Sequence, residues 1–266
     1  MTERLRHLVG GGTTPDYATG TKRLAAAQHV IDLARRHIGV IAPNGPNEEG
    51  RSLDGMTEPL QTSERLGLCD LLVELGPAAP TLCAGWTNYD LAAHLYVREH
   101  DPIAGIGIIV PPAAHLHDAA IERTKERMPF EVIVRKVRSG PPLWWKPLDG
   151  LANVQEMFVH HEDVRRGGGN ITPRPITAIR ELEHRLWSNL RHTHWMMTRN
   201  IRGVRVELAA PGEAAIRTGG GNDHVLISGR PGEVLLYLLG RRTAANVDIT
   251  GTDAGLAALE RSNLGI

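Results

Sequence analysis

The stretch from Asn153 to Arg166 constrains the fold more than any other part of the sequence. It contains neither proline nor glycine, its apolar residues recur with helical spacing, and three glycines follow it, so it predicts a helix that ends there. Glu156 and His160 are four residues apart, about 6 Å along the helix axis, so their side chains can reach one point. A carboxylate and an imidazole placed in this way are two of the three protein ligands that an open divalent-metal site needs.

The composition argues against several classes of protein. The 30 basic and 30 acidic residues cancel, so no strong field indicates a nucleic-acid partner or an anionic membrane. The sequence has no run of about 18 apolar residues and no apolar segment of signal-peptide type near residue 1. Cys69 and Cys83 lack CxxC spacing, which suits a reducing cytosol better than a disulfide framework. We therefore expect a cytoplasmic protein; the sequence does not define its oligomeric state.

Three segments of the chain differ in character. Residues 1–55 combine loop compositions with one amphipathic pattern, which predicts a partly helical N-terminal extension that is dispensable for function. Residues 56–170 predict four helices with short links, as in an antiparallel bundle, with Pro129 kinking or splitting the third. Residues 171–266 combine helices with alternating strand patterns and predict a small C-terminal α+β domain. The predicted fold class is thus α+β, a four-helix bundle followed by this domain.

The expected element bounds follow from the same periodicities. Helices are predicted over residues 57–75, 87–101, 118–139, 151–166, 175–199, 231–241 and 253–262. Strands are predicted over residues 204–208, 214–218, 224–228 and 247–249. Thr87 and Asp90 resemble a capping box at the start of the second helix, with Asp in the place usually held by Glu or Gln.

The third ligand of a metal site is expected from the second helix. His94 lies in the apolar arc of that helix and faces inward, and three protein ligands with one open position form the catalytic pattern. On the fourth helix the apolar stripe places His161 at its centre and Glu156 and His160 at its edge. Periodicity alone therefore leaves His160 and His161 as equal ligand candidates. The alternative role for His161 is a core histidine that hydrogen-bonds a neighbour.

Other chemistry-bearing residues give weaker signals. Cys69 and Cys83 have apolar neighbours and are expected to be simply buried. His115 and His117 form an HxH pair that can bind metal, although the expected loop position favours solvated side chains. The pair Arg165-Arg166 can hold a substrate carboxylate or interact with the helix dipole, and the dipole interaction is the simpler interpretation.

Three segments resemble a known family of metalloenzymes. Residues 82–95 contain Gly-Trp-x3-Asp-Leu-x2-His-Leu, residues 156–165 contain Glu-x3-His, and residues 227–241 resemble the C-terminal domain of one branch. Together they are similar to the DinB/YfiT-like metalloenzymes, and within them to the actinobacterial mycothiol-dependent maleylpyruvate isomerase family. The resemblance covers about residues 57–266 and leaves the first 55 unexplained.

The resemblance implies a site and a chemistry. His94, Glu156 and His160 would be zinc ligands and His161 would not. If the site is present, Glu162 or Asp163 is expected to orient a ligand imidazole, because metal-bound histidines usually need such a partner. The implied function is a mycothiol-dependent isomerase or S-transferase that activates the thiol on zinc, with a small-molecule thiol and an electrophilic substrate as partners. The alternatives are zinc-water hydrolysis of an amide or ester, and a non-catalytic metal-binding or sensor protein.

Overall fold

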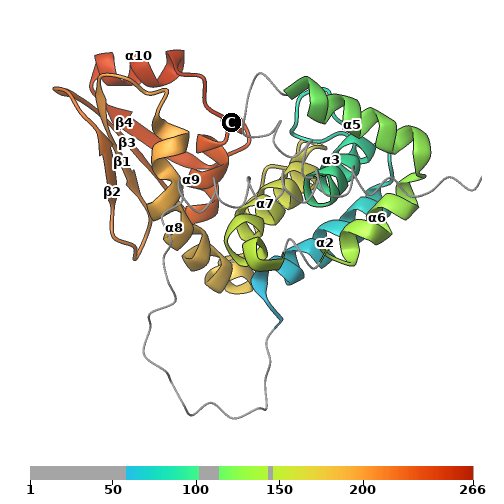
Figure 1. Cartoon of the computed structure of the whole chain (residues 1–266). Coiled ribbons are helices and arrows are strands. Elements are labelled where there is room, and N and C mark those ends of the chain that lie inside the picture. Colours follow the sequence, from blue (N-terminus) through green and yellow to red (C-terminus); the bar gives the residue numbers. More distant parts are fainter. Residues whose placement is uncertain (1–57, 102–113, 143–145, 266) are drawn as a thin grey trace, which may run out of the picture.

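The structure, a computed structural model, describes residues 58–101, 114–142 and 146–265. Within this range a helical part comes first and a mixed sheet follows it (Figure 1). The helical part comprises α2 (Leu60–Leu75), α3 (Asn88–His100), α5 (Ala114–Arg127), α6 (Phe130–Arg138) and α7 (Lys146–Arg166). The predicted N-terminal extension, residues 1–55, lies outside the described residues.

The remaining described elements form the α+β part of the chain. Its helices are α8 (Ile176–Thr198), α9 (Pro231–Leu238) and α10 (Asp253–Arg261). Its strands are β1 (Val204–Ala209), β2 (Ile216–Gly219), β3 (Asp223–Gly229) and β4 (Val247–Gly251). Every strand predicted from the sequence is present within two residues of its expected start, so the predicted α+β class is confirmed.

Two helices of the bundle begin earlier than the sequence predicts. Helix α5 begins at Ala114 and not at Asp118, because the intervening residues contain no helix breaker. Helix α7 begins at Lys146 and not at Leu151, since Pro147 falls in the first turn, where its missing N–H removes no helical hydrogen bond. Pro129 splits the predicted third helix into α5 and α6, as one of the two outcomes expected for it.

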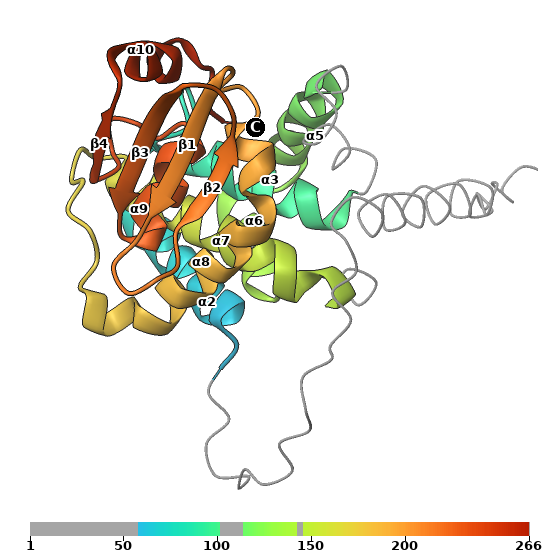
Figure 2. The same cartoon turned by 90° about the vertical axis from the view of Figure 1, so that its left-hand side faces the viewer.

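The sheet has the order β2-β1-β3-β4. Strands β1 and β3 pair in parallel, whereas β1 with β2 and β3 with β4 are antiparallel. Figures 1 and 2 show α8 and α9 between the sheet and the helical part. Helices α8 and α9 therefore form the layer that separates the sheet from the bundle.

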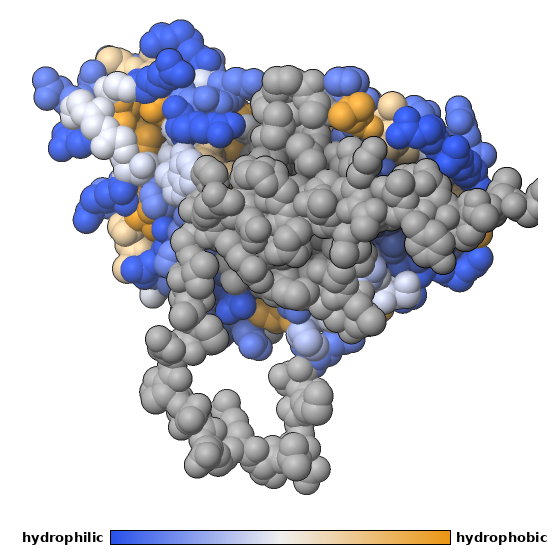
Figure 3. Space-filling view, in the orientation of Figure 1, coloured by the Kyte–Doolittle hydropathy of each residue, from blue (hydrophilic) through white to orange (hydrophobic). Residues whose placement is uncertain are grey.

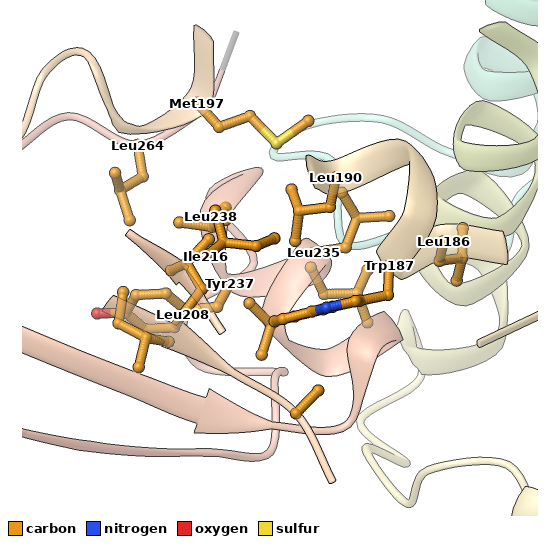
Figure 4. Packing of buried hydrophobic residues seen from close by; sticks show 14 of the residues in the cluster. Leu186, Trp187, Leu190, Met197, Leu208, Ile216, Leu235, Tyr237, Leu238 and Leu264 are labelled. Atoms are coloured by element: carbon orange, nitrogen blue, oxygen red, sulfur yellow. The ribbon is translucent and has the colours of Figure 1, made fainter. Parts of the chain in front are cut away.

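The apolar interior forms two main clusters among the described residues. One lies within the bundle and includes Leu68, Leu91 and Ile133. The other lies between α8, α9 and the sheet, where Trp187 is fully buried and its indole Nε1 donates to the Ala214 carbonyl over 3.1 Å (Figure 4). Helix α7 contributes to both, so the domain boundary expected at residue 170 stays a prediction.

A buried ionic seam joins α7 to the α+β part. The Arg166 guanidinium, 1% exposed, donates to Glu162 Oε2 over 2.5 Å and to Glu233 Oε1 over 2.7 Å. The second oxygen of Glu233 accepts the backbone N–H of Asn246 over 2.8 Å. Buried charges of this kind are tolerated only with such partners. The same interface is tight at Gly232, where an added Cβ would lie 2.5 Å from Phe158 Cζ.

The visible coloured surface in Figure 3 is mostly hydrophilic, with hydrophobic residues in separate patches. The large exposed hydrophobic side chains of the described range come from different elements, for example Val73 of α2 and Trp195 of α8. Within the described ranges, the length and apolarity needed to cross a bilayer are not found together in any helix.

Glu64 on α2 is held by two partners from distant parts of the chain. Its carboxylate faces His161 Nδ1 at 3.0 Å and accepts two hydrogen bonds from Arg174, over 2.8 and 3.0 Å. Burial opposes the charged carboxylate, but the hydrogen bonds with His161 and Arg174 outweigh burial and lower the pKa of Glu64 to about 2. The ion pair therefore stabilises the fold most when Glu64 is ionised.

The stability contributed by Glu64 should be lost in acid. Because its folded pKa, about 2, lies below its ordinary value of 4.5, the contribution is complete above about pH 4.5 and is lost as the pH falls toward 2. Between about pH 6 and about pH 3.5, we expect the difference in unfolding free energy between wild type and Glu64→Gln to shrink by about 1.4 kcal/mol. Urea denaturation at both pH values measures it. The exposed Glu58→Gln is the matched control, and an unchanged difference for Glu64→Gln would contradict the prediction.

Candidate metal centre

Helices α3 and α7 bring three potential ligands together. The capping box predicted at the start of α3 is present, and Asp90 Oδ2 accepts the Thr87 backbone N–H over 2.8 Å. Lys125 of α5 binds the other oxygen of Asp90 over 2.5 Å, which fixes α3 against α5. His94, about one turn after Asp90 on α3, is then buried and faces α7.

The expected ligand atoms converge on the carboxylate of Glu156. Its Oε1 lies 3.1 Å from His160 Nε2 and 3.4 Å from His94 Nε2. All three ligand atoms lie within 4.8 Å of one another. His94 and His160 are each 7% exposed, and the Glu156 side chain is 25% exposed, so the cluster is buried but reachable on the Glu156 side.

The second ring nitrogen of each histidine is also engaged. His160 Nδ1 lies 2.9 Å from Asp163 Oδ2, so the carboxylate accepts its hydrogen. His94 Nδ1 lies 2.7 Å from His117 Nε2. Ligand histidines in metalloproteins usually hydrogen-bond through the nitrogen that does not bind the metal. Both rings therefore present Nε2 to the same point.

A chain of buried polar side chains holds Glu156, the third potential ligand. Arg98 Nε lies 3.2 Å from Glu156 Oε1, and Arg98 Nη1 donates to Asn153 Oδ1 over 2.5 Å. Asn153 in turn donates to Glu99 Oε1 over 3.1 Å, and Arg65 of α2 binds Glu99 through both carboxylate oxygens. The orientation of Glu156 thus depends on side chains from α2 and α3.

The electrostatics of the cluster favour positive charge at its centre. Burial lowers the pKa of His94 to about 4, so this ring is neutral. Burial opposes ionisation of Glu156, but Arg98 and the two histidines outweigh it and hold the pKa of Glu156 well below its ordinary value. Burial also opposes charge on His160, but the hydrogen bonds that it makes, above all the one that it donates to Asp163, raise its pKa well above its ordinary value. An imidazolium is consequently stabilised between two carboxylates.

The donor set and its spacing fit a divalent cation. Two imidazole nitrogens and one carboxylate oxygen are a known catalytic zinc set. Ligand atoms about 2.0–2.1 Å from a tetrahedral centre lie roughly 3.3 Å from one another. The two contacts of Glu156 Oε1, at 3.1 and 3.4 Å, bracket this spacing.

A second group of potential ligands shares His160. Cys83, His160 and Asp163 also lie within ligand distance of one another. Two of these three groups are already engaged by Arg241, which donates to both oxygens of Asp163, over 2.9 and 2.7 Å, and lies 3.3 Å from Cys83 Sγ. We therefore assign this group to the support of His160 and not to a second metal.

The structure separates the two histidines that periodicity left equivalent. His160 faces Glu156, whereas His161 faces Glu64 on α2 and lies apart from the cluster. The expected hydrogen bond of His161 with a neighbour is therefore confirmed, and its side chain is partly buried, 15% exposed. Of the two residues expected to orient a ligand imidazole, Asp163 contacts His160, and Glu162 pairs with arginines instead.

Sequence reasoning missed several groups around the site. His117 was expected in a solvated loop, but it lies on α5, is 6% exposed and contacts His94. Cys83 was expected to be simply buried, but it contacts Asp163 and Arg241. The buried residues Ala120 and Ile121, three and four positions after His117, are the helical signal that could have placed its ring inward.

Comparison with known proteins gives an overall structural similarity. No family model and no curated protein matches the chain. Its structure is similar to the crystal structure of the mycothiol-dependent maleylpyruvate isomerase, with a TM-score of 0.43 and 15% sequence identity, over 74% of this chain and 91% of that chain. A likeness of this size assigns no ligand, substrate or reaction to this chain.

The loop that carries Cys83 docks on the end of α7. The Leu82 backbone N–H donates to the Asp163 carbonyl over 3.0 Å. Gly167 packs so closely on this loop that an added Cβ would lie 2.1 Å from the Pro80 carbonyl oxygen and 2.7 Å from Thr81 Cα. Because both are backbone atoms, the clash cannot be relieved by a side-chain rotation.

Gly167→Ala should therefore destabilise the protein by about 1–3 kcal/mol, the usual cost of forcing extra volume into a packed site. Gly168→Ala is the matched control, since a Cβ at Gly168 meets nothing within 4 Å, and it should change stability by less than about 0.5 kcal/mol. Chemical denaturation of both variants measures the difference. Equal stability of the two would show that the loop yields without cost.

Proposed function

We propose that this chain is a divalent-metal-binding enzyme that activates a small-molecule thiol at the centre formed by His94, Glu156 and His160. The observation that carries the proposal is the convergence of three donor atoms from two helices on one buried point. Zinc is the cation that this donor set suits. Mycothiol is the proposed thiol, and the sequence resemblance to mycothiol-dependent isomerases supports it.

The protein's own residues would hold and orient the group. When bound, a divalent cation supplies Lewis acidity, which lowers the pKa of a thiol or water at its open position. Asp163 fixes His160 with Nε2 toward the centre, and Arg241 keeps Asp163 ionised in its buried place. Arg98 holds Glu156 as a carboxylate.

The setting of the cluster favours an enzyme over a purely structural metal site. Three protein ligands leave a coordination position for a reactant, whereas structural zinc sites are closed by four. Glu156 retains the exposure through which a small molecule can approach. The proposed reaction is a thiol-dependent isomerisation or S-transfer to an electrophilic carbon, which gives the chain a thiol and an electrophile as partners.

Metal content tests whether the chain binds a divalent cation at His94, Glu156 and His160, which both the thiol enzyme and the zinc hydrolase require. Purified wild-type protein should hold about one equivalent of zinc, and His94→Gln should lower its affinity by more than roughly 100-fold, because losing a ligand costs more than losing an outer partner. His161→Gln is the matched control: it changes the neighbouring histidine of α7, which faces Glu64, and should leave metal affinity unchanged. Elemental analysis and chelator competition provide the readouts. Zinc retention by His94→Gln equal to wild type would reject the site.

Binding of mycothiol tests whether the proposed enzyme uses a thiol. The zinc-loaded protein should melt about 5–10 °C higher when mycothiol is present at about 100 times its dissociation constant, and glutathione should give a smaller shift. His160→Gln should abolish the mycothiol shift. No shift with either thiol would reject the thiol enzyme, and zinc-dependent ester or amide hydrolysis in that case would establish the hydrolase.

A further inference from the structure

His117 lies on the inward face of α5, directly behind His94. The two rings are 4.9 Å apart between centroids and nearly perpendicular, at 81°, with His117 Nε2 2.7 Å from His94 Nδ1. His117 is 6% exposed, and Ala120 and Ile121 are buried on the same helical face. Its ring is therefore part of the packing between α3 and α5 and not a solvated surface group.

The hydrogen bond between the two rings has two arrangements in a metal-free protein. A neutral imidazole has one nitrogen that donates and one that accepts, so either ring can be the donor. When His94 binds a cation through Nε2, only one of the two arrangements is possible. Nε2 must then carry a lone pair, so the hydrogen of His94 is on Nδ1. That hydrogen points at His117 Nε2, which accepts it, and His117 carries its own hydrogen on Nδ1.

The two ligand histidines are thus supported by different chemistry. His160 donates to a carboxylate, Asp163, which is itself held by Arg241. His94 has a second imidazole, that of His117, in the corresponding place. The His94 ring is further enclosed by His160 and by Trp86, at centroid distances of 5.0 and 5.1 Å, so a loss of its partner does not by itself open the ring to solvent.

We propose that His117 is a positioning residue of the metal centre. It accepts the hydrogen of His94 Nδ1 and thereby fixes the orientation and the tautomer in which His94 presents Nε2 to the cation. This inference rests on the proposed function, because it requires that His94 binds a cation. It adds α5 to the elements that build the centre.

Three variants separate this role from simple packing. His117→Phe keeps an aromatic ring without the acceptor, and it should weaken zinc and cobalt binding by roughly 10–100-fold in chelator competition. The visible d–d bands of the cobalt-loaded protein should change in position or intensity. His117→Gln, which restores an acceptor, should return both affinity and bands to near wild type. His115→Phe, on the exposed face of the same helix, should leave both unchanged.

The outcomes distinguish this inference from the proposed function. Wild-type protein that binds neither zinc nor cobalt overturns both. Wild-type protein that binds cobalt, with His117→Phe unaltered in affinity and in bands, overturns this inference alone. Weakened binding in His117→Phe without recovery in His117→Gln shows a packing role and also overturns it. Circular dichroism melts of the metal-free variants establish that each is folded before the comparison is made.

Discussion

The burial of charged side chains on α7 is the constraint on which the rest of the structure depends. An unpaired buried charge costs several kcal/mol, so each must meet a partner from another element. Asp163 meets Arg241, and Arg166 meets Glu233, both from segments that follow the sheet's first three strands. The α+β part therefore packs against the bundle through specific ion pairs as well as through apolar contacts such as that of Phe158 with Gly232.

Helices and strands are predictable from the sequence where the signal comes from residues that are close together in the chain. Alternation predicts β1, and the capping box at Thr87 predicts the start of α3. The start of a helix is less predictable near a proline: Pro147 lies before the predicted start of the fourth helix at residue 151, but it occupies the first turn of α7. The packing of α7 into both apolar clusters depends on tertiary contacts that periodicity does not encode.

The candidate site was predictable only in part, for the same reason. Glu156 and His160 are related by helical geometry, so their proximity follows from the sequence. The contact of Glu156 with His160 and not with His161 does not follow, because His161 pairs with Glu64, which lies 97 positions away. Arg241 reaches Cys83 across 158 positions, and no spacing rule extends so far. The residues that orient a candidate ligand come from whichever element packs beside it. Candidate ligands on one helix are therefore easier to predict than the residues that orient them.

The contact of Arg241 with Asp163 makes the two parts of the chain inseparable as a chemical unit. Asp163 orients His160 from within α7, while the guanidinium that neutralises it is delivered by the segment after α9. A bundle transplanted without that segment would carry all three donor side chains and still lack the counter-charge that keeps one of them aligned. A related protein that keeps this arrangement must therefore also keep Arg241, although Arg241 lies on neither α3 nor α7, the helices that carry the three donor side chains.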